Sequence, residues 1–261
     1  MPMERSVGSV DGTRIGYLEL GSGPGIVFVH GSLGVGDAWL QVANLLADRF
    51  TCYLMDRRGR GRSGNAERYS LDTECADIAA VLEAAGPTSA LLGHSYGGIC
   101  ALEAARRIRV SKLILYEPPF PIDGPTVGDA FERYRAAVAN NQLDEALLIG
   151  ARDLVKLTDV QIKEWRASPA WQLAAALTPT WVRELEVIRS LPLGVERFSQ
   201  MSSPTLLLLG TATARHHEVA SAALAETLPS AHTRRLVDQG HQAQVFAPTL
   251  VAREIAGFVE S

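Results

Sequence analysis

Residues 91–98 read LLGHSYGG, an apolar run that ends in Gly-His-Ser-Tyr-Gly and is followed by the helical pattern GICALEAARRI. A serine on a sharp turn from a strand into a helix projects its Oγ from the edge of the sheet. Glycines at 93 and 97 would let the two backbones pass closely, and a helix start favours developing negative charge. We therefore predict that Ser95 is a nucleophile; the alternative is a serine that only fills a turn.

The elements that position Ser95 are predicted from near-continuous apolar runs, which are typical of parallel strands buried on both faces. These runs are GIVFVH (25–30), CYLMD (52–56), SALLGH (89–94), KLILYE (112–117) and TLLLLG (205–210). Helical patterns lie at about 37–48, 71–85, 97–108 and 217–228, before a short strand, HTRRLV, and a last helix. Asp11-Gly12 predicts a hairpin upstream. The alternation predicts a doubly wound, mostly parallel α/β sheet, in which ligands gather at the carboxyl ends of the strands.

Residues 121–200 interrupt this alternation, because they contain helical stretches and no convincing buried strand. A helical insertion of this length is too long for a simple crossover between two core strands. We interpret it as a helical lid, or cap, above the strand ends, with residues 1–120 and 201–261 forming the core. The alternative is an ordinary run of packing helices.

Further motifs accompany the Ser95 turn along the chain. They are His30-Gly31 after a core strand, the DRRGRGRSG stretch at 56–64, the Gly93 to Gly98 motif, and Gly240-His241 near the C-terminus. Together they resemble the α/β-hydrolase superfamily, and the likeness covers almost the whole chain. A Gly-x-Ser-x-Gly motif alone would be weak evidence, but it is strong in its predicted strand, turn and helix context. The resemblance implies a serine hydrolase that needs no cofactor.

The base of such an enzyme takes the proton of the serine hydroxyl, a role that suits histidine because its pKa lies near neutrality. The resemblance assigns this role to His241, in the loop VDQGHQAQVFAP between the last short strand and the last helix. We expect His94 to pack away from the nucleophile beside it. His232 is expected to begin an exposed strand.

The oxygen that becomes negative during acyl transfer needs hydrogen-bond donors. The resemblance implies two backbone amides: that of Tyr96, directly after the nucleophile, and that of Ser32, with Leu33 as the neighbouring choice. We expect His30 to brace this loop through a hydrogen bond rather than to act in catalysis.

The triad acid is missing from its usual position. Many superfamily members carry it two or three residues beyond the glycine that ends the seventh strand, and here Ala212 and Thr213 stand there. Glu117 ends the preceding core strand, where a carboxylate is well placed to face the same crevice as Ser95 and His241. Some superfamily members use this position, including haloalkane dehalogenases with a glutamate there.

A narrower resemblance supports Glu117. The lactonases that open the mycotoxin zearalenone resemble this chain at Ser95, Glu117 and His241, and they too lack a carboxylate in the loop matching GTATA. We therefore predict that Glu117, after strand 6, orients His241. Asp238 is the rival acid, although a loop residue so close in sequence often cannot reach the far ring nitrogen. Glu218 is the weakest choice, because its helix pattern turns it outward.

These assignments predict hydrolysis of an ester or lactone bond in a small, largely hydrophobic substrate through an acyl-enzyme. Trp181, in LTPTWVREL, would offer the substrate a flat surface, and the likeness to the lactonases includes a lid tryptophan in a comparable stretch. Core packing is the alternative. Carbon–carbon bond hydrolases and cofactor-free perhydrolases share the same triad. A non-catalytic ligand-binding or receptor module also stays open, since fold does not fix function.

Composition and charge indicate which classes of partner the protein binds. A chain of 261 residues with 47% hydrophobic and 21% charged residues fits one well-buried globular domain. A net charge of −4 gives no basic footprint for nucleic acid or an anionic membrane surface. MPMERSVGSVDGT carries no signal core or lipidation signature, and no apolar run approaches the length of a membrane span. We expect a cytoplasmic protein with a small-molecule substrate, and a homo-oligomer stays open.

Metal sites and anion sites are not expected. Cys52, Cys75 and Cys100 stand in apolar settings without metal-ligand spacing, so we interpret them as small core residues. The adjacent His216 and His217 would point in different directions on one helix, which favours a solvated helix start over a metal site. A group of loop arginines is expected to be solvated or paired with acids such as Asp56; they are Arg57, Arg58, Arg60 and Arg62.

Overall fold

The structure is a computed structural model that describes residues 2–261; residue 1 of the predicted core lies outside the described residues. Within residues 2–261 it holds one eight-stranded sheet with the strand order β1-β2-β4-β3-β5-β6-β7-β8. β2 pairs antiparallel with β1 and β4, and every other neighbouring pair is parallel. The strands are β1 (Met3–Gly8), β2 (Arg14–Gly21), β3 (Gly25–Val29), β4 (Thr51–Met55), β5 (Ala90–His94), β6 (Leu113–Tyr116), β7 (Thr205–Gly210) and β8 (Ala231–Leu236). The predicted mostly parallel sheet is confirmed.

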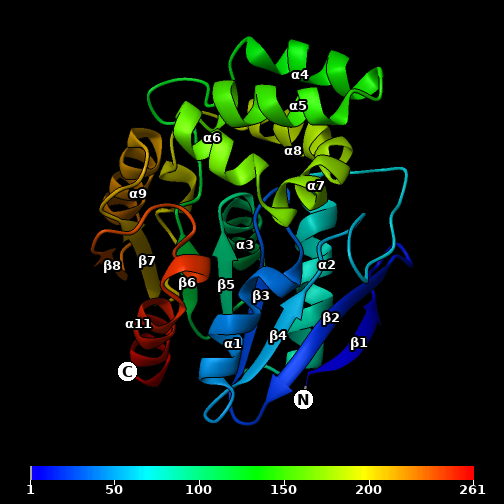
Figure 1. Ribbon diagram of the computed structural model, residues 1–261. Helices are drawn as coiled ribbons and strands as arrows, with labels where there is room; N and C mark the ends of the chain where they lie inside the picture. The colour runs from blue at the N-terminus through cyan, green and yellow to red at the C-terminus, as the bar shows by residue number, and fades with distance from the viewer. Residues whose placement is uncertain (1) are drawn as a thin grey trace. The chain divides into compact units, whose positions relative to one another are not determined.

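Helices cover both faces of this sheet (Figure 1). The helices outside residues 120–193 are η1 (Gly36–Trp39), α1 (Leu40–Leu46), α2 (Leu71–Ala85), α3 (Tyr96–Arg107), η3 (Glu196–Phe198), α9 (Arg215–Thr227), α10 (Ala243–Phe246) and α11 (Pro248–Glu260). α2 begins where the Ser70 side chain accepts from Thr73 N and the Thr73 side chain accepts from Ser70 N, a capping box. No helix within residues 2–261 combines the length and the apolar composition needed to cross a membrane.

The main core lies between the sheet and the α1–α11 pair, which pack on each other. Ile26, Phe28 and Leu92 of the central strands contribute to it, together with Trp39 and Ile255 from the helices. Because side chains alternate along a strand, the intervening residues face the other side, where α2 and α3 pack together. Burial on both faces explains why the strands read as continuous apolar runs.

A second compact unit comprises residues 120–193 and 32–34, whereas residues up to 31, 35–119 and 194–261 form the sheet unit. The helices of the second unit are α4 (Ala130–Ala139), α5 (Leu143–Ile149), the π-helical turn η2 (Gly150–Leu154), α6 (Asp159–Arg166), α7 (Pro169–Ala176) and α8 (Thr178–Ser190). Residues 120–193 contain no strand, and a separate apolar cluster around Leu147, Ile162 and Trp171 holds the unit together. Residues 194–200, which include η3, belong to the sheet unit. The function of this unit as a lid stays a prediction.

Candidate active site

Ser95 is the single residue between the end of β5 and the start of α3. Its backbone angles, φ 54° and ψ −126°, lie in a region that non-glycine residues rarely adopt, and such strain is typical of functional turns. A Cβ at Gly97 would overlap the backbone carbonyls of Val29 and His30, and a Cβ at Gly93 would overlap that of Gly97. The predicted sharp turn and its need for glycine are confirmed.

Strand register places Glu117 beside this turn. In the parallel pair β5–β6, His94 stands opposite Tyr116, so the next residues, Ser95 and Glu117, leave the sheet at the same edge. The Ser95 amide donates to the Tyr116 carbonyl at 2.9 Å and extends the ladder by one bond. Glu117 itself has φ 48°, so the chain turns sharply at the carboxylate.

The Glu117 carboxylate is completely buried, and three donors satisfy it. Oε1 accepts from the Gly210 amide at 2.8 Å, and Oε2 accepts from Thr213 Oγ1 at 2.8 Å. His241 Nδ1 lies 2.6 Å from Oε2. Because an ionised carboxylate can only accept, the Nδ1 of His241 carries the proton, and its Nε2 is the nitrogen that can take one. Glu117 and His241 therefore form a part-buried, charge-assisted pair.

Two side chains, His94 and Tyr116, anchor the backbone of the His241 loop through hydrogen bonds. His94 Nε2 lies 2.9 Å from the His241 carbonyl, and burial lowers the pKa of His94, which favours the neutral ring that donates there. The Tyr116 hydroxyl donates to the Gly240 carbonyl and accepts from the Ala243 amide at 3.0 Å. His94 thus packs as expected, but it also fixes the backbone of the predicted base.

His217 lies against His241, which corrects the expectation of a solvated helix start. The two rings stack with their centroids 4.2 Å apart and their planes 12° from parallel. His217 is only 5% exposed, and burial lowers its pKa. His217 is buried because the first turn of α9 faces the loop that follows β8. The sequence of two adjacent helix residues does not indicate which loop packs against them. His216 retains part of its exposure.

The rival acids do not reach the His241 ring. Asp238 and Glu218 are both exposed, and the Asp238 amide donates to Thr211 Oγ1 at 2.8 Å. Among the described residues the Ser95 hydroxyl forms no hydrogen bond with His241, so the contact that would activate the nucleophile stays a prediction. Catalytic hydrogen bonds often tighten only when substrate binds.

The other predicted site residues are placed as follows. Ser32 and Leu33 belong to the helical unit, with Leu33 at φ 55°, and Tyr96 is a fully buried residue of the sheet unit. The oxyanion hole stays a prediction. Trp181 is buried in the helical unit, edge-on to Tyr134 with ring centroids 5.2 Å apart. Its contact with substrate also stays a prediction.

Arg57, Arg58 and Arg62 of the loop pair with acids. Arg57 and Arg58 have no exposed side-chain surface; Arg57 binds Glu74, and Arg58 binds both carboxylate oxygens of Asp77 at 2.6 and 2.7 Å. Arg62 pairs with Asp56 at 3.0 Å, as expected. For Arg57 and Arg58 the expected pairing with acids is confirmed, and the acids are Glu74 and Asp77 of α2.

His30 braces its own loop through hydrogen bonds, as predicted, and joins it to the arginine loop. Its Nε2 accepts from the Arg57 amide at 3.1 Å, and its Nδ1 lies 2.7 Å from the Gly31 carbonyl. Burial, with the nearby positive charge of Arg57, lowers the pKa of His30 well below its ordinary value. His30 is therefore a neutral structural residue.

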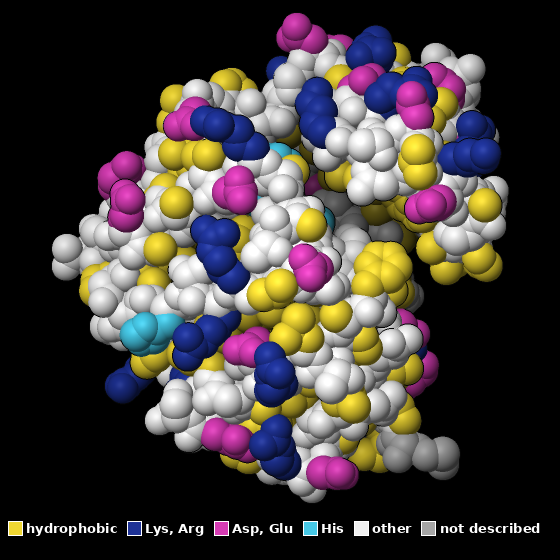
Figure 2. Space-filling model, turned by 60° about the vertical axis from the view of Figure 1, so that its left-hand side comes forward, with side chains coloured by type: hydrophobic (Ala, Val, Ile, Leu, Met, Phe, Trp, Pro, Cys, Tyr) yellow, Lys and Arg dark blue, Asp and Glu magenta, His cyan; other side chains and the backbone are white. Residues whose placement is uncertain are grey.

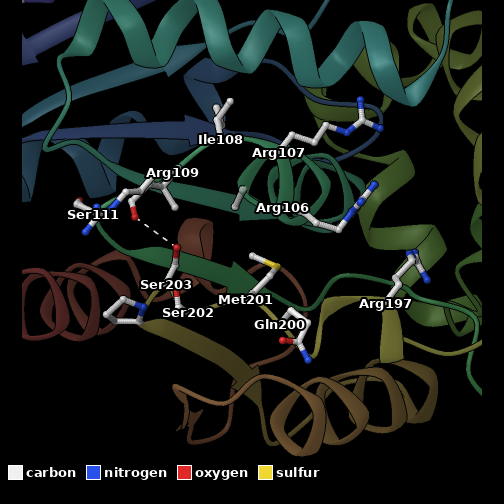
Figure 3. Close-up of a pocket in the computed structure, with 13 residues that line it drawn as sticks. Arg106, Arg107, Ile108, Arg109, Ser111, Arg197, Gln200, Met201, Ser202 and Ser203 are labelled. Atoms are coloured by element: carbon white, nitrogen blue, oxygen red, sulfur yellow. Dashed lines mark hydrogen bonds between the residues drawn. The ribbon is translucent and has the colours of Figure 1, made fainter.

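A cavity of about 600 Å³ lies elsewhere in the sheet unit (Figure 3). Arginines line it, but Arg106 and Arg197 both pair with Glu103 at 3.0 Å, and Arg107 pairs with Asp72. None of the predicted catalytic residues borders it. Figure 2 likewise shows basic and acidic side chains interspersed over the face it presents. We therefore assign the candidate site to Ser95, Glu117 and His241.

Comparison with known proteins identifies the family. Residues 26–255 match the model of the Alpha/beta hydrolase family, and the chain belongs to this family. It is similar to an alpha/beta hydrolase from Sphaerobacter thermophilus, with 30% identity, a TM-score of 0.88 and coverage of 97% of this chain and 99% of that one. An esterase from a Rhodococcus species is 26% identical with a TM-score of 0.78, covering 99% and 98%.

A curated relative shares only part of the chain. N-formylmaleamate deformylase of Pseudomonas putida is 37% identical over 123 residues, which cover 45% of each protein. The chain therefore spans about half the length of this curated relative. The predicted α/β-hydrolase fold is confirmed. The narrower resemblance to zearalenone lactonases stays a prediction.

Proposed function

We propose that the protein is a serine hydrolase that cleaves an ester or lactone bond of a small, largely hydrophobic substrate through an acyl-enzyme. One observation carries the proposal: the buried Glu117 carboxylate lies 2.6 Å from His241 Nδ1 at the sheet edge where Ser95 leaves β5. A buried carboxylate stabilises the imidazolium that forms when histidine takes a proton.

In the first step Ser95 Oγ attacks the substrate carbonyl carbon while His241 Nε2 takes the hydroxyl proton. The amides of Tyr96 and of Ser32 or Leu33 are the proposed donors to the oxyanion. His241 then gives its proton to the leaving oxygen as the carbon–oxygen bond breaks, which leaves Ser95 acylated. In a lactone this leaving oxygen stays attached to the acyl chain.

In the second step water attacks the acyl carbon while His241 takes one of its protons. The ester bond to Ser95 breaks, the proton passes from His241 to Ser95 Oγ, and the free acid leaves. Glu117 orients His241 and stabilises the imidazolium in both steps, while the Gly210 amide and Thr213 Oγ1 hold its carboxylate in place.

The family and the likeness to the Rhodococcus esterase support ester cleavage. The likeness to N-formylmaleamate deformylase favours a second candidate, removal of a formyl group by the same residues. Trp181 remains the proposed apolar contact that would select a hydrophobic, aromatic substrate.

The proposed acyl-enzyme is tested with p-nitrophenyl butyrate. We expect a burst of p-nitrophenol stoichiometric with enzyme, or steady turnover if deacylation is fast, and loss of both in Ser95→Ala. An alkyl phosphonate should add its mass to the peptide containing Ser95 and to no other. Retained turnover in Ser95→Ala would overturn the proposal, and tight ester binding without any turnover would indicate a receptor.

A substrate panel separates the bond types. We expect higher kcat/KM for aryl-substituted lactones and apolar esters than for N-formyl amides. The reverse order would favour the deformylase candidate and contradict the ester assignment.

A further inference from the structure

We propose that Glu117, His217 and His241 bind a divalent transition-metal ion such as Zn²⁺, and that the bound ion switches the active site off. Only the inhibitory consequence rests on the proposed function; the metal site itself rests on the geometry of the three side chains. His217, which takes no part in the proposed reaction, completes the site.

The three side chains converge from separate elements. Glu117 follows β6, His217 lies in the first turn of α9, and His241 lies in the loop after β8. One carboxylate oxygen and one nitrogen from each ring all lie within 4.8 Å of one another. Zinc binds such atoms at about 2.0–2.2 Å, so its ligands stand roughly 3.4 Å apart. Metal binding therefore requires the Glu117 and His241 atoms, now 2.6 Å apart, to separate and the His217 ring to turn out of its stack on His241.

The donor set matches the chemistry of the ion. Two imidazoles and one carboxylate, with a fourth position left for water, form one of the common zinc sites of proteins. The carboxylate supplies a negative charge that is already buried, and the ion would supply the opposite charge that His241 supplies when protonated.

A second observation points to a ligand at His217. Its Nδ1 is buried and has no hydrogen-bond partner within residues 2–261. Buried polar atoms in native proteins are nearly always satisfied, so an unpartnered ring nitrogen requires an explanation. A metal ion bound at this nitrogen would satisfy it.

Solvent can reach this set through His241, whose side chain is 22% exposed. Metal binding to His241 blocks the reaction whichever nitrogen it takes. At Nδ1 the ion displaces the proton donated to Glu117, and at Nε2 it occupies the nitrogen that must accept the proton of Ser95. The site therefore couples metal binding to loss of activity.

Cobalt provides a readout that does not depend on activity. Titration of metal-free protein with Co²⁺ should give the strong visible d–d absorption of a four-coordinate site at one equivalent, and Zn²⁺ should abolish it. His217→Phe should weaken Co²⁺ binding by about 10–100-fold or more. His217→Gln repeats the test with a polar side chain, and circular dichroism shows whether each variant folds.

Two matched controls locate the site. His232→Gln changes an exposed histidine of β8 and should leave Co²⁺ binding unchanged. The His216 ring has its centroid 3.9 Å from that of His217, so His216→Gln tests a surface pair formed by the adjacent histidines. Loss of the signal in His216→Gln or His232→Gln, with retention in both His217 variants, would overturn the proposal.

The second part of the test measures how metal ions affect ester hydrolysis. Zn²⁺ should inhibit wild-type turnover, a chelator should restore it, and the turnover that remains in His217→Phe should resist Zn²⁺ at concentrations at least tenfold higher. Cobalt binding without any esterase activity would contradict the proposed function and leave the metal site intact. Esterase activity without a cobalt site would contradict the metal site alone.

Discussion

Thr213 donates a hydrogen bond to Glu117: its Oγ1 lies 2.8 Å from the same carboxylate oxygen that pairs with His241 Nδ1. Thr213 stands at one of the two positions where many α/β hydrolases carry the triad acid. In this chain, residue 213 therefore donates a hydrogen bond to the Glu117 carboxylate, which follows the neighbouring strand β6, and does not itself provide a carboxylate. Within residues 2–261, its hydroxyl and the Gly210 amide are the two donors to the Glu117 carboxylate besides His241.

Thr213→Val removes this donor and keeps the shape of the side chain. A hydrogen bond to a buried charged group contributes about 1.5–3 kcal/mol, so we expect kcat for p-nitrophenyl butyrate to fall roughly tenfold or more. Thr213→Ser keeps the hydroxyl and should stay within about threefold of wild type. Equal kcat in the valine and serine variants would show that the bond does not support catalysis.

A carboxylate at position 213 should replace Glu117 in part. The double variant Glu117→Gln with Thr213→Asp places a negative charge close to the His241 ring. We expect its kcat to exceed that of Glu117→Gln alone by roughly tenfold, because a carboxylate again stabilises the imidazolium. The matched control is Glu117→Gln with Thr213→Asn, in which the new side chain has no charge and no rescue is expected.

Tyr116→Phe tests the anchor of the His241 loop. The Tyr116 hydroxyl bonds the Gly240 carbonyl and the Ala243 amide, and its loss leaves both without this partner. We expect the free energy of unfolding to drop by about 1–3 kcal/mol, with a fall in kcat as the loop loosens. Tyr53→Phe, in the half-buried tyrosine of β4, is the control and should change either quantity little. Unchanged stability in Tyr116→Phe would contradict the anchor.

Buried histidines make stability depend on pH. Burial lowers the pKa of His30, His94 and His217 in the folded state below the ordinary value of 6.5. Below that value the unfolded chain binds more protons than the folded chain, so stability falls as the pH falls. Urea unfolding should show a lower free energy at about pH 5.5 than at about pH 7.5, with each histidine contributing up to about 1.4 kcal/mol per pH unit.

His30→Gln checks the origin of this dependence. A glutamine carbonyl can still accept from the Arg57 amide, but it does not titrate. The variant should therefore lose less stability than wild type over the same pH interval. An equal loss in both proteins would show that His30 does not contribute.

The sequence predicts the sheet and the Ser95 turn well, because both depend on local patterns. Strands buried on both faces appear as apolar runs, and Gly93 and Gly97 indicate the close crossing of β5 and α3. The range predicted for α2, 71–85, coincides with the helix, since Ser70 caps one end and Gly86 follows the other.

Other features depend on contacts between distant segments, and local patterns carry little information about them. The stack of His217 on His241 requires the turn of α9 to face the loop after β8. The burial of Arg57 and Arg58 requires Glu74 and Asp77 on α2 to lie opposite their loop. In contrast, Glu117 could be chosen in advance, because a strand-end position in a parallel sheet fixes the edge to which the side chain belongs.

The central claim is that Glu117, and no other acid, supports His241. The most direct measurement is kcat for p-nitrophenyl butyrate in Glu117→Gln and Asp238→Asn, with folding checked by circular dichroism. We expect Glu117→Gln to lower kcat by about 10³–10⁴-fold, because the imidazolium loses its negative partner, and Asp238→Asn to remain within about twofold of wild type. The opposite result, with activity lost in Asp238→Asn and retained in Glu117→Gln, would contradict the claim.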